Sequence, residues 1–142
     1  MAQATRQETW DVSVEKIWNV ITDYQSYAEF VDGVSAVEVL EQDESGARVK
    51  FSLNLIKKFS YILKLKHEPH TKISWSFETG DIFKKNEGSW QFKDLGDGKT
   101  QIDYALEVDI KGFVPKAIVN SLTSKNLPAM MDSYQNRAKN SH

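Results

Sequence analysis

A row of aromatic residues, two of them tyrosines, recurs in apolar segments between residues 51 and 104. A tyrosine carries a hydroxyl on a large apolar ring, so a buried tyrosine needs a hydrogen-bond partner and could orient a polar group. Tyr61 and Tyr104 are therefore the first candidates for contact with a bound molecule. The other rings favour either the wall of an apolar cavity or ordinary core packing, and both interpretations stay open. The row consists of Phe51, Tyr61, Trp75, Phe77, Trp90 and Tyr104.

Groups for nucleophilic, acid–base or metal chemistry form no recognisable constellation. His67, Glu68 and His70 flank Pro69, and their spacing differs from the two histidines, four apart on a helix, that bind zinc in proteases. We interpret them as a surface loop. The chain has no cysteine, which excludes disulfides, thiolate nucleophiles and cysteine metal sites. The sequence therefore predicts no catalytic residue, no metal site and no cofactor.

The charged residues of the same segments are expected to face water. Asp103, Glu107 and Asp109 alternate with apolar residues, and Arg48 also falls on the polar side of its segment. A cluster of lysines favours a solvated sheet face, with a local basic patch as the alternative. These are Lys57, Lys58, Lys64, Lys66, Lys84 and Lys85.

The first part of the chain predicts one strand and two helices. Residues 5–12 read as a strand, and Ser13 is a suitable N-cap for a helix. Asp23 is predicted to cap a second, short helix that ends near Gly33. The first helix has an apolar face with helical spacing, formed by Val14, Ile17, Trp18 and Ile21, and the second carries Tyr24, Tyr27 and Phe30.

After these helices, apolar and polar residues alternate through about six segments separated by turn signals, of which Asp97-Gly98 is the clearest. This pattern predicts an antiparallel meander with one buried face. The last segment returns to helical spacing, and Pro128 within it predicts a kink or break. Its apolar positions are Val114, Ile118 and Leu122, followed by Leu127, Met131, Tyr134 and Ala138.

The buried face of such a sheet is larger than two short helices can cover, so the C-terminal helix must lie across it. We therefore predict an α+β fold in which a curved antiparallel sheet of about seven strands wraps around a long C-terminal helix. Where sheet and helix do not meet tightly, an apolar cavity is expected.

Composition agrees with one globular domain spanning residues 1–142. The chain is 40% hydrophobic and 27% charged with a net charge of −2, which disfavours a nucleic-acid binder that works through bulk charge. No apolar run reaches the roughly 18 residues of a transmembrane helix, and residues 1–7 lack the apolar core of a signal peptide. We expect a cytoplasmic protein.

Over nearly its whole length the sequence resembles the START-like (SRPBCC) superfamily, in particular its polyketide cyclase/dehydrase and coenzyme Q-binding branch. Ala28 and Val31 stand where that family usually has prolines. The resemblance implies the helix-grip fold, with the order β-α-α-β6-α, and a cavity for a hydrophobic small molecule. It rests on Asp23 with Tyr27 to Val31, Gly33-Val34 and Val37 to Leu40, on Gly88 to Phe92 with Gly98 to Thr100 and Ile102 to Tyr104, and on Phe113 to Pro115 with Leu127 to Met130.

Three functions follow as hypotheses. The first is binding or carriage of a lipid, an isoprenoid quinone or a polyketide-like ring without catalysis. The second is an aromatase/cyclase enzyme, and the third is ribosome association, as the resemblance implies for some relatives. Nucleic acid is otherwise not an expected partner. The residues predicted to line the cavity are Phe51, Leu53, Tyr61, Leu63, Trp75, Phe77, Trp90, Phe92, Tyr104, Leu106, Ile118, Leu122, Met130 and Met131.

Overall fold

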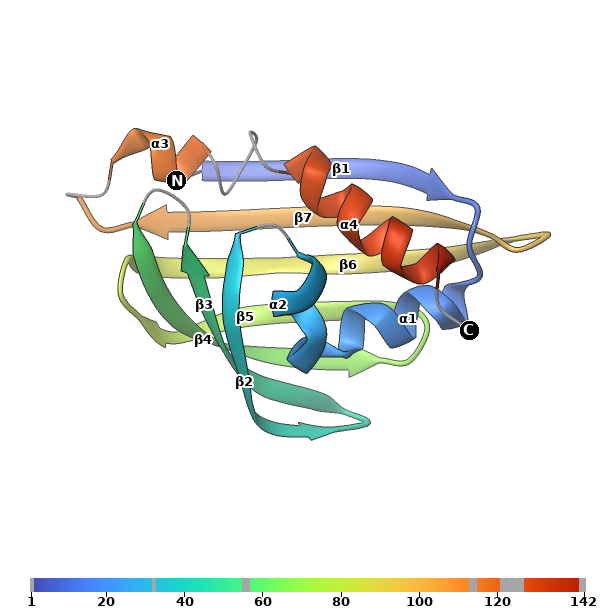
Figure 1. The fold of residues 1–142 in the computed structure, drawn as a ribbon, viewed down its shortest axis with the longest axis horizontal. Coiled ribbons are helices and arrows are strands. Elements are labelled where there is room, and N and C mark those ends of the chain that lie inside the picture. The colour runs from blue at the N-terminus through green and yellow to red at the C-terminus, as the bar shows by residue number, and fades with distance from the viewer. Residues whose placement is uncertain (1, 32, 55–56, 113–114, 121–126, 141–142) are drawn as a thin grey trace.

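A single antiparallel sheet dominates the computed structural model, which describes residues 2–31, 33–54, 57–112, 115–120 and 127–140. Seven strands lie in the order β1-β7-β6-β5-β4-β3-β2, so the first and last strands of the chain are neighbours (Figure 1). The strands are β1 (Ala2–Trp10), β2 (Val34–Asp43), β3 (Gly46–Asn54), β4 (Lys58–Glu68), β5 (Lys72–Gly80), β6 (Phe83–Gly96) and β7 (Lys99–Ile110).

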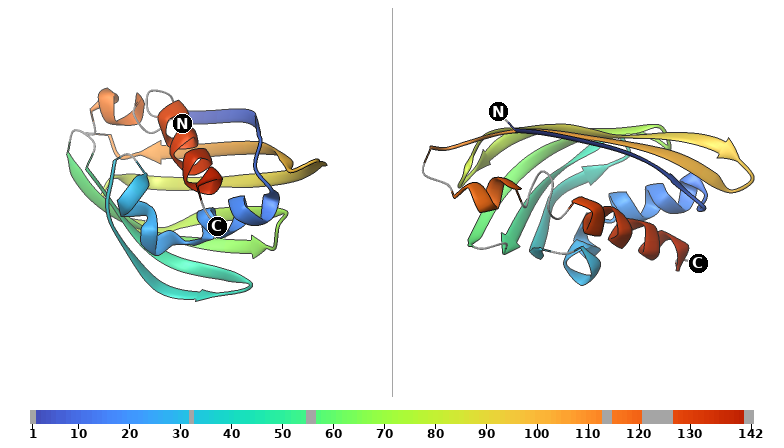
Figure 2. Two further views of the ribbon diagram at one scale, coloured as in Figure 1. Left: turned by 45° about the vertical axis from the view of Figure 1, so that its right-hand side comes forward. Right: turned by 90° about the horizontal axis from the view of Figure 1, so that it is seen from above.

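The helices all lie on the concave side of this sheet. Seen from above, the sheet forms an arch and the helices fill the space beneath it (Figure 2). They are α1 (Val14–Thr22), the 3-10 turn η1 (Tyr24–Ser26), α2 (Tyr27–Phe30), α3 (Lys116–Asn120) and α4 (Leu127–Lys139). The predicted α+β helix-grip architecture is thereby confirmed. No helix in the described ranges is long and apolar enough to cross a membrane.

Bulges and one tight hairpin give the sheet its curvature. Register shifts interrupt the β2–β3, β4–β5 and β6–β7 pairings, and each bulge bends its strand and increases the twist. The predicted Asp97-Gly98 turn joins β6 to β7 with positive φ angles of 57° and 73°. Both residues thus adopt the mirror-image turn whose twist matches that of the flanking strands.

The sequence prediction of α1 is confirmed in detail. The Ser13 side chain accepts a hydrogen bond from the Lys16 amide at 3.4 Å, and Ile17, Trp18 and Ile21 are buried. Asp23 occupies the N-cap position of η1, as predicted, but its side chain makes no capping hydrogen bond there. The first strand also starts earlier than predicted and ends at Trp10 rather than residue 12.

Helix α4 connects the sheet to the small helices. Its predicted apolar stripe, Leu127, Met131, Tyr134 and Ala138, is buried. The Tyr134 ring meets Trp90 of β6 and Tyr27 of α2 edge to face, at centroid distances of 5.1 Å and 5.3 Å. Pro128 stands in the first described turn of α4, a position that tolerates proline. Three predicted apolar positions, Phe113, Val114 and Leu122, lie outside the described residues.

Strands β5 and β6 are paired over part of their length and then separate, and we call the point of separation the fork. They pair only between Lys72–Trp75 and Gly88–Gln91, whereas β4 and β5 pair along the whole of β5. Trp75 lies at the fork, and its indole Nε1 donates to Asn86 Oδ1 at 3.0 Å. Gly88 makes room for this ring, because a Cβ there would lie 2.4 Å from Trp75 Cζ2 and 2.3 Å from the Ala105 carbonyl oxygen.

Replacing Gly88 tests the fork. We expect Gly88→Ala to lower the free energy of unfolding by about 1–3 kcal/mol, since neither the carbonyl nor the packed indole can yield without strain. Urea unfolding monitored by circular dichroism measures the change. Gly112→Ala is the matched control, because a Cβ there meets nothing within 4 Å. Equal stability of the two variants would show that Gly88 is not needed to seat Trp75.

Candidate functional site

A cavity of about 150 Å³ lies between the concave face of the sheet and the helices. Every strand except β1 contributes to its wall, together with α1, η1, α2 and α4. The wall is mainly aliphatic and aromatic. It is formed by Ile21, Tyr24, Tyr27, Val34, Phe51, Leu53, Tyr61, Leu63, Leu65, Ile73, Trp75, Phe83, Asn86, Trp90, Tyr104, Leu106, Val108, Met130 and Tyr134.

The structure brings most of the side chains predicted from the sequence together around this cavity. They come from five neighbouring strands, β3 to β7, and from α4. Where one strand supplies two of them, they are two residues apart, as strand alternation implies. Whether they contact a ligand remains a prediction. The predicted residues that line the cavity are Phe51, Leu53, Tyr61, Leu63, Trp75, Trp90, Tyr104, Leu106 and Met130.

Four other predicted residues lie away from the cavity. Phe92 is buried against Trp18 of α1, with ring centroids 6.0 Å apart, and Phe77 packs against Phe83 at 6.1 Å. Ile118 of α3 and Met131 of α4 are fully buried in the core. Alternation gives the face of a strand but not the depth along it, which explains Phe77 and Phe92. Helical spacing likewise marks Ile118 and Met131 as buried without showing what they face. Leu122 lies outside the described residues.

Sequence reasoning missed the part of the wall that the helices supply. Tyr24 and Tyr27 were noted as helix positions, and Tyr134 as part of the α4 stripe, but nothing in their spacing distinguishes cavity wall from core. Asn86 has no apolar signal at all. It faces inward because it lies in phase with Trp90 and Phe92 along β6, so strand alternation could have found it; the register shift between Phe83 and Lys85 instead brings Phe83 to the same face. The other missed residues are Ile21, Val34, Leu65, Ile73, Phe83 and Val108.

All five tyrosines of the chain line this one cavity. The hydroxyl of Tyr27 donates to the Ile21 carbonyl oxygen, and that of Tyr24 lies 2.8 Å from His67 Nε2. Burial raises the pKa of each tyrosine well above its ordinary value of 10.0, and Tyr134 adds to the shift of Tyr27. All five phenols are therefore neutral donors at physiological pH.

Three polar groups in the wall have unused hydrogen-bonding capacity. In the described ranges, every side-chain oxygen or nitrogen that is sealed from solvent has a partner. The hydroxyls of Tyr61 and Tyr104 and the amide nitrogen of Asn86 bond to none of the described residues, so they are not sealed and are open to the cavity they line. The Asn86 oxygen is already taken by Trp75. The cavity thus offers neutral donors in an apolar wall.

His67 corrects the prediction of a surface loop. It lies within β4 with 7% of its surface exposed, its ring stacked on Tyr24 and edge-on to Trp18. Burial lowers the pKa of His67 below its ordinary value of 6.5, and its interactions with Asp43 oppose the shift. The pair Tyr24–His67 therefore forms a neutral polar support behind the cavity wall. No group of metal-ligating side chains occurs among the residues described.

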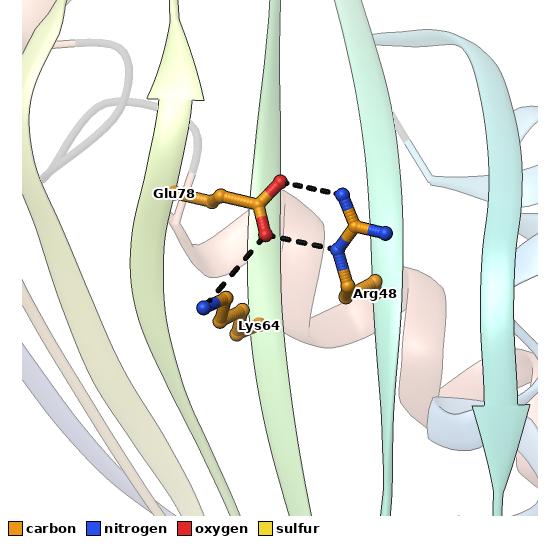
Figure 3. Close-up of polar contacts among 3 residues, drawn as sticks. All are labelled: Arg48, Lys64 and Glu78. Atoms are coloured by element: carbon orange, nitrogen blue, oxygen red, sulfur yellow. Dashed lines mark hydrogen bonds and ion pairs between the residues drawn. The ribbon is translucent and has the colours of Figure 1, made fainter.

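Charged side chains lie on the other face of the sheet. Arg48 of β3 reaches across β4 to Glu78 of β5, with Nε and Nη2 donating at 2.9 Å and 2.8 Å, and Lys64 approaches Glu78 to 3.9 Å (Figure 3). The Arg48 hydrogen bonds hold the pKa of Glu78 below its ordinary value. No ionised side chain among the described residues lines the cavity.

The acidic residues of β7 also face outward, as predicted. Glu107 pairs with Lys85 at 3.2 Å, and Asp103 accepts hydrogen bonds from Gln7 and Gln101. These contacts leave no acid–base pair inside the cavity within the described ranges.

Solved structures share this arrangement of sheet and helices. A START superfamily protein from Mycobacterium smegmatis superposes with a TM-score of 0.83 at 18% identity, covering 96% of this chain and 97% of that one. The Zhui aromatase/cyclase from Streptomyces sp. R1128 gives a TM-score of 0.86 at 16% identity, covering 97% and 93%. These likenesses show that the chain has the same helix-grip fold as these proteins.

The family model described as polyketide cyclase/dehydrase and lipid transport matches residues 10–134, and the chain belongs to that family. Among characterised relatives, the ribosome association toxin RatA of Pseudomonas aeruginosa is 31% identical over 126 residues, covering 87% of this chain and 85% of that protein. RatA of Vibrio cholerae is 26% identical over 141 residues, covering 98% and 96%.

The buried histidine makes stability depend on pH. The unfolded chain binds a proton at His67 more readily than the folded chain, so the free energy of unfolding should fall as pH drops below about 6.5. Urea unfolding between pH 7.5 and 5.5 measures this slope. We expect His67→Gln to reduce it and the exposed control His70→Gln to leave it unchanged. An unaltered slope in His67→Gln would contradict the assignment.

Proposed function

We propose that this chain binds and carries a small hydrophobic molecule in the cavity between the sheet and α4. One observation carries the proposal: an apolar cavity of about 150 Å³ whose wall contains polar groups that bond to none of the described residues. Small-molecule sites typically combine such an apolar wall with a few placed polar groups. The family description, which includes lipid transport, supports the same function.

Burial of apolar ligand surface would supply the affinity. Each Å² removed from water is worth about 25 cal/mol, before the cost of association is subtracted. An apolar cavity of this size holds a ring the size of benzene as it stands, so a ligand of two or more rings requires the wall to widen. Met130 contributes a flexible, polarisable wall in α4, which suits ligands of varied shape.

Binding accounts for the cavity better than catalysis does. The likeness to an aromatase/cyclase is a likeness of fold at 16% identity, and a shared fold does not carry a shared reaction. Acid–base chemistry needs a group whose pKa lies near the working pH. Burial moves the pKa values of the lining tyrosines away from neutrality. We therefore assign no reaction to this site.

Filling the cavity tests the proposal. The purified protein should enhance the fluorescence of N-phenyl-1-naphthylamine, a neutral apolar probe, with saturation at one equivalent. We expect Leu63→Trp, which fills the cavity, to weaken binding at least tenfold. Leu95→Trp adds the same ring at a side chain that is 45% exposed and should bind as the wild type does.

Circular dichroism and a thermal melt of both variants show whether they are folded, so that loss of the cavity is separated from loss of the fold. Two results would contradict the proposal: failure of the wild-type protein to bind the probe, or unchanged binding by a folded Leu63→Trp variant.

Ribosome association is the second candidate, because relatives that cover most of the chain carry that name. The surface offers one matching feature. Exposed lysines that have no ion pair among the described residues gather at the end of the sheet where β4 and β6 begin and β7 ends. The Lys111 amide bonds to the Ile82 carbonyl at 2.9 Å, and Asp81 contacts Ser60, which ties these segments together. The cluster consists of Lys57, Lys58, Lys84, Lys111 and Lys116.

Charge reversal tests the second candidate. We expect the protein to co-sediment with ribosomes at low salt and to dissociate as salt rises, because lysine–phosphate contacts release counterions. The double variant Lys58→Glu/Lys84→Glu should lose most of this binding. The double variant Lys93→Glu/Lys99→Glu carries the same charge change at the opposite end of β6 and should retain it. Equal behaviour of the two variants, or no co-sedimentation at all, would reject this role.

A further inference from the structure

The chemistry of the cavity wall restricts the charge of what it binds. No lysine, arginine, histidine, aspartate or glutamate of the described ranges lines the cavity. The ionic groups of β3 to β5 are held on the opposite face, as the Arg48–Glu78 pair shows. An ionised ligand would therefore enter without a counter-ion, and burying an unpaired charge is far more costly than burying a neutral polar group.

The same wall presents hydrogen-bond donors that none of the described residues uses. The hydroxyls of Tyr61 and Tyr104 and the amide nitrogen of Asn86 bond to no described residue, and the Asn86 oxygen already accepts from Trp75. The two hydroxyls can also accept a hydrogen bond, whereas the Asn86 NH₂ group can only donate. A phenol and an amide NH₂ group donate readily to a carbonyl or ether oxygen. Leaving such donors unpaired against a pure hydrocarbon loses the hydrogen bonds they would otherwise make.

Tyr61 and Tyr104 occupy a defined place in this wall. The Tyr61 ring meets Phe83 edge to face at 4.9 Å, and the Tyr104 ring meets Trp90 in the same way at 4.7 Å. Packing of both rings fixes the positions of their hydroxyls, so a ligand oxygen meets preorganised donors rather than mobile ones. Flat aromatic rings around the cavity favour a flat ligand.

We infer that the cavity selects a neutral, flat ring compound bearing an acceptor oxygen, and discriminates both against the corresponding carboxylate and against the corresponding hydrocarbon. This inference rests on the proposed binding function and adds the class of ligand. The Tyr61 and Tyr104 hydroxyls and the Asn86 amide hold the acceptor oxygen, and the absence of a cation in the described wall excludes the anion.

Three naphthalenes of similar size form the test: 2-acetylnaphthalene, 2-ethylnaphthalene and 2-naphthoate. Their dissociation constants are measured at pH 7.5 by competition against N-phenyl-1-naphthylamine. We expect the ketone to bind about threefold to tenfold more tightly than the hydrocarbon, which corresponds to one net hydrogen bond. The carboxylate should bind at least tenfold more weakly than the ketone.

Two variants assign the preference to the named donors. In the double variant Tyr61→Phe/Tyr104→Phe the ketone should lose most of its advantage over the hydrocarbon, because only the Asn86 amide then remains to donate to its oxygen, while the hydrocarbon binds as before. Tyr27→Phe is the matched control, because the Tyr27 hydroxyl also lines the cavity but already donates to the Ile21 carbonyl. The ratio of the two dissociation constants is the readout, so a change in stability alone does not imitate the effect.

The outcomes separate this inference from the function on which it rests. Equal binding of all three compounds, or tightest binding of the carboxylate, would overturn the selectivity while leaving the cavity as a binding site. A ketone preference that is as large in the double variant as in the wild type would overturn the role of the two tyrosines. If the protein binds neither the probe nor any of the naphthalenes, the binding function and the selectivity fail together.

Discussion

The structure depends on one constraint. The helices must cover the concave face of a seven-stranded sheet, but they are too few to fill the space beneath it. Strand alternation makes that face apolar, and bulges curve it so that it encloses α1, α2 and α4. Helix α4 touches the sheet through Tyr134 and the small helices through the same ring. The cavity is the volume that this cover leaves unfilled.

The polar groups follow from the same constraint. A side chain that faces the arch is removed from water, so any polar group there must find a partner or remain open to the cavity. Tyr24 and Tyr27 find partners in His67 and the Ile21 carbonyl, whereas Tyr61 and Tyr104 do not in the described ranges. The difference divides four of the five tyrosines into structural supports and donors available to a ligand, and the fifth, Tyr134, shares a side-chain hydrogen bond with Tyr27. The ionic groups of β3 to β5 are not buried beneath the arch, because strand alternation places them on the convex face.

Sequence patterns predicted the architecture and much of the cavity wall, because strand alternation and helical spacing directly report which side chains are buried. They could not predict where along a strand a buried side chain reaches the cavity and where a helix covers it. Phe92 and Trp90 belong to the same face of β6, yet Trp18 of α1 covers Phe92 while Trp90 reaches the cavity. His67 appeared to be a loop residue because Pro69 follows closely, but β4 extends to Glu68 and buries it. Asn86 lies in phase with Trp90 and Phe92, so alternation places it on the inner face, but a polar side chain gives no sign that it lines an apolar cavity.

Because all five tyrosines surround one cavity, they can report directly on its occupancy. Replacing tyrosine with 3-fluorotyrosine gives a protein with five fluorine signals, which can be recorded while 2-acetylnaphthalene is added. Our account predicts that the signals of Tyr61 and Tyr104 shift most and that all five respond with the same saturation, since every ring lines the wall. Saturable binding that leaves the five signals in place would show that the ligand binds elsewhere, and would contradict the account.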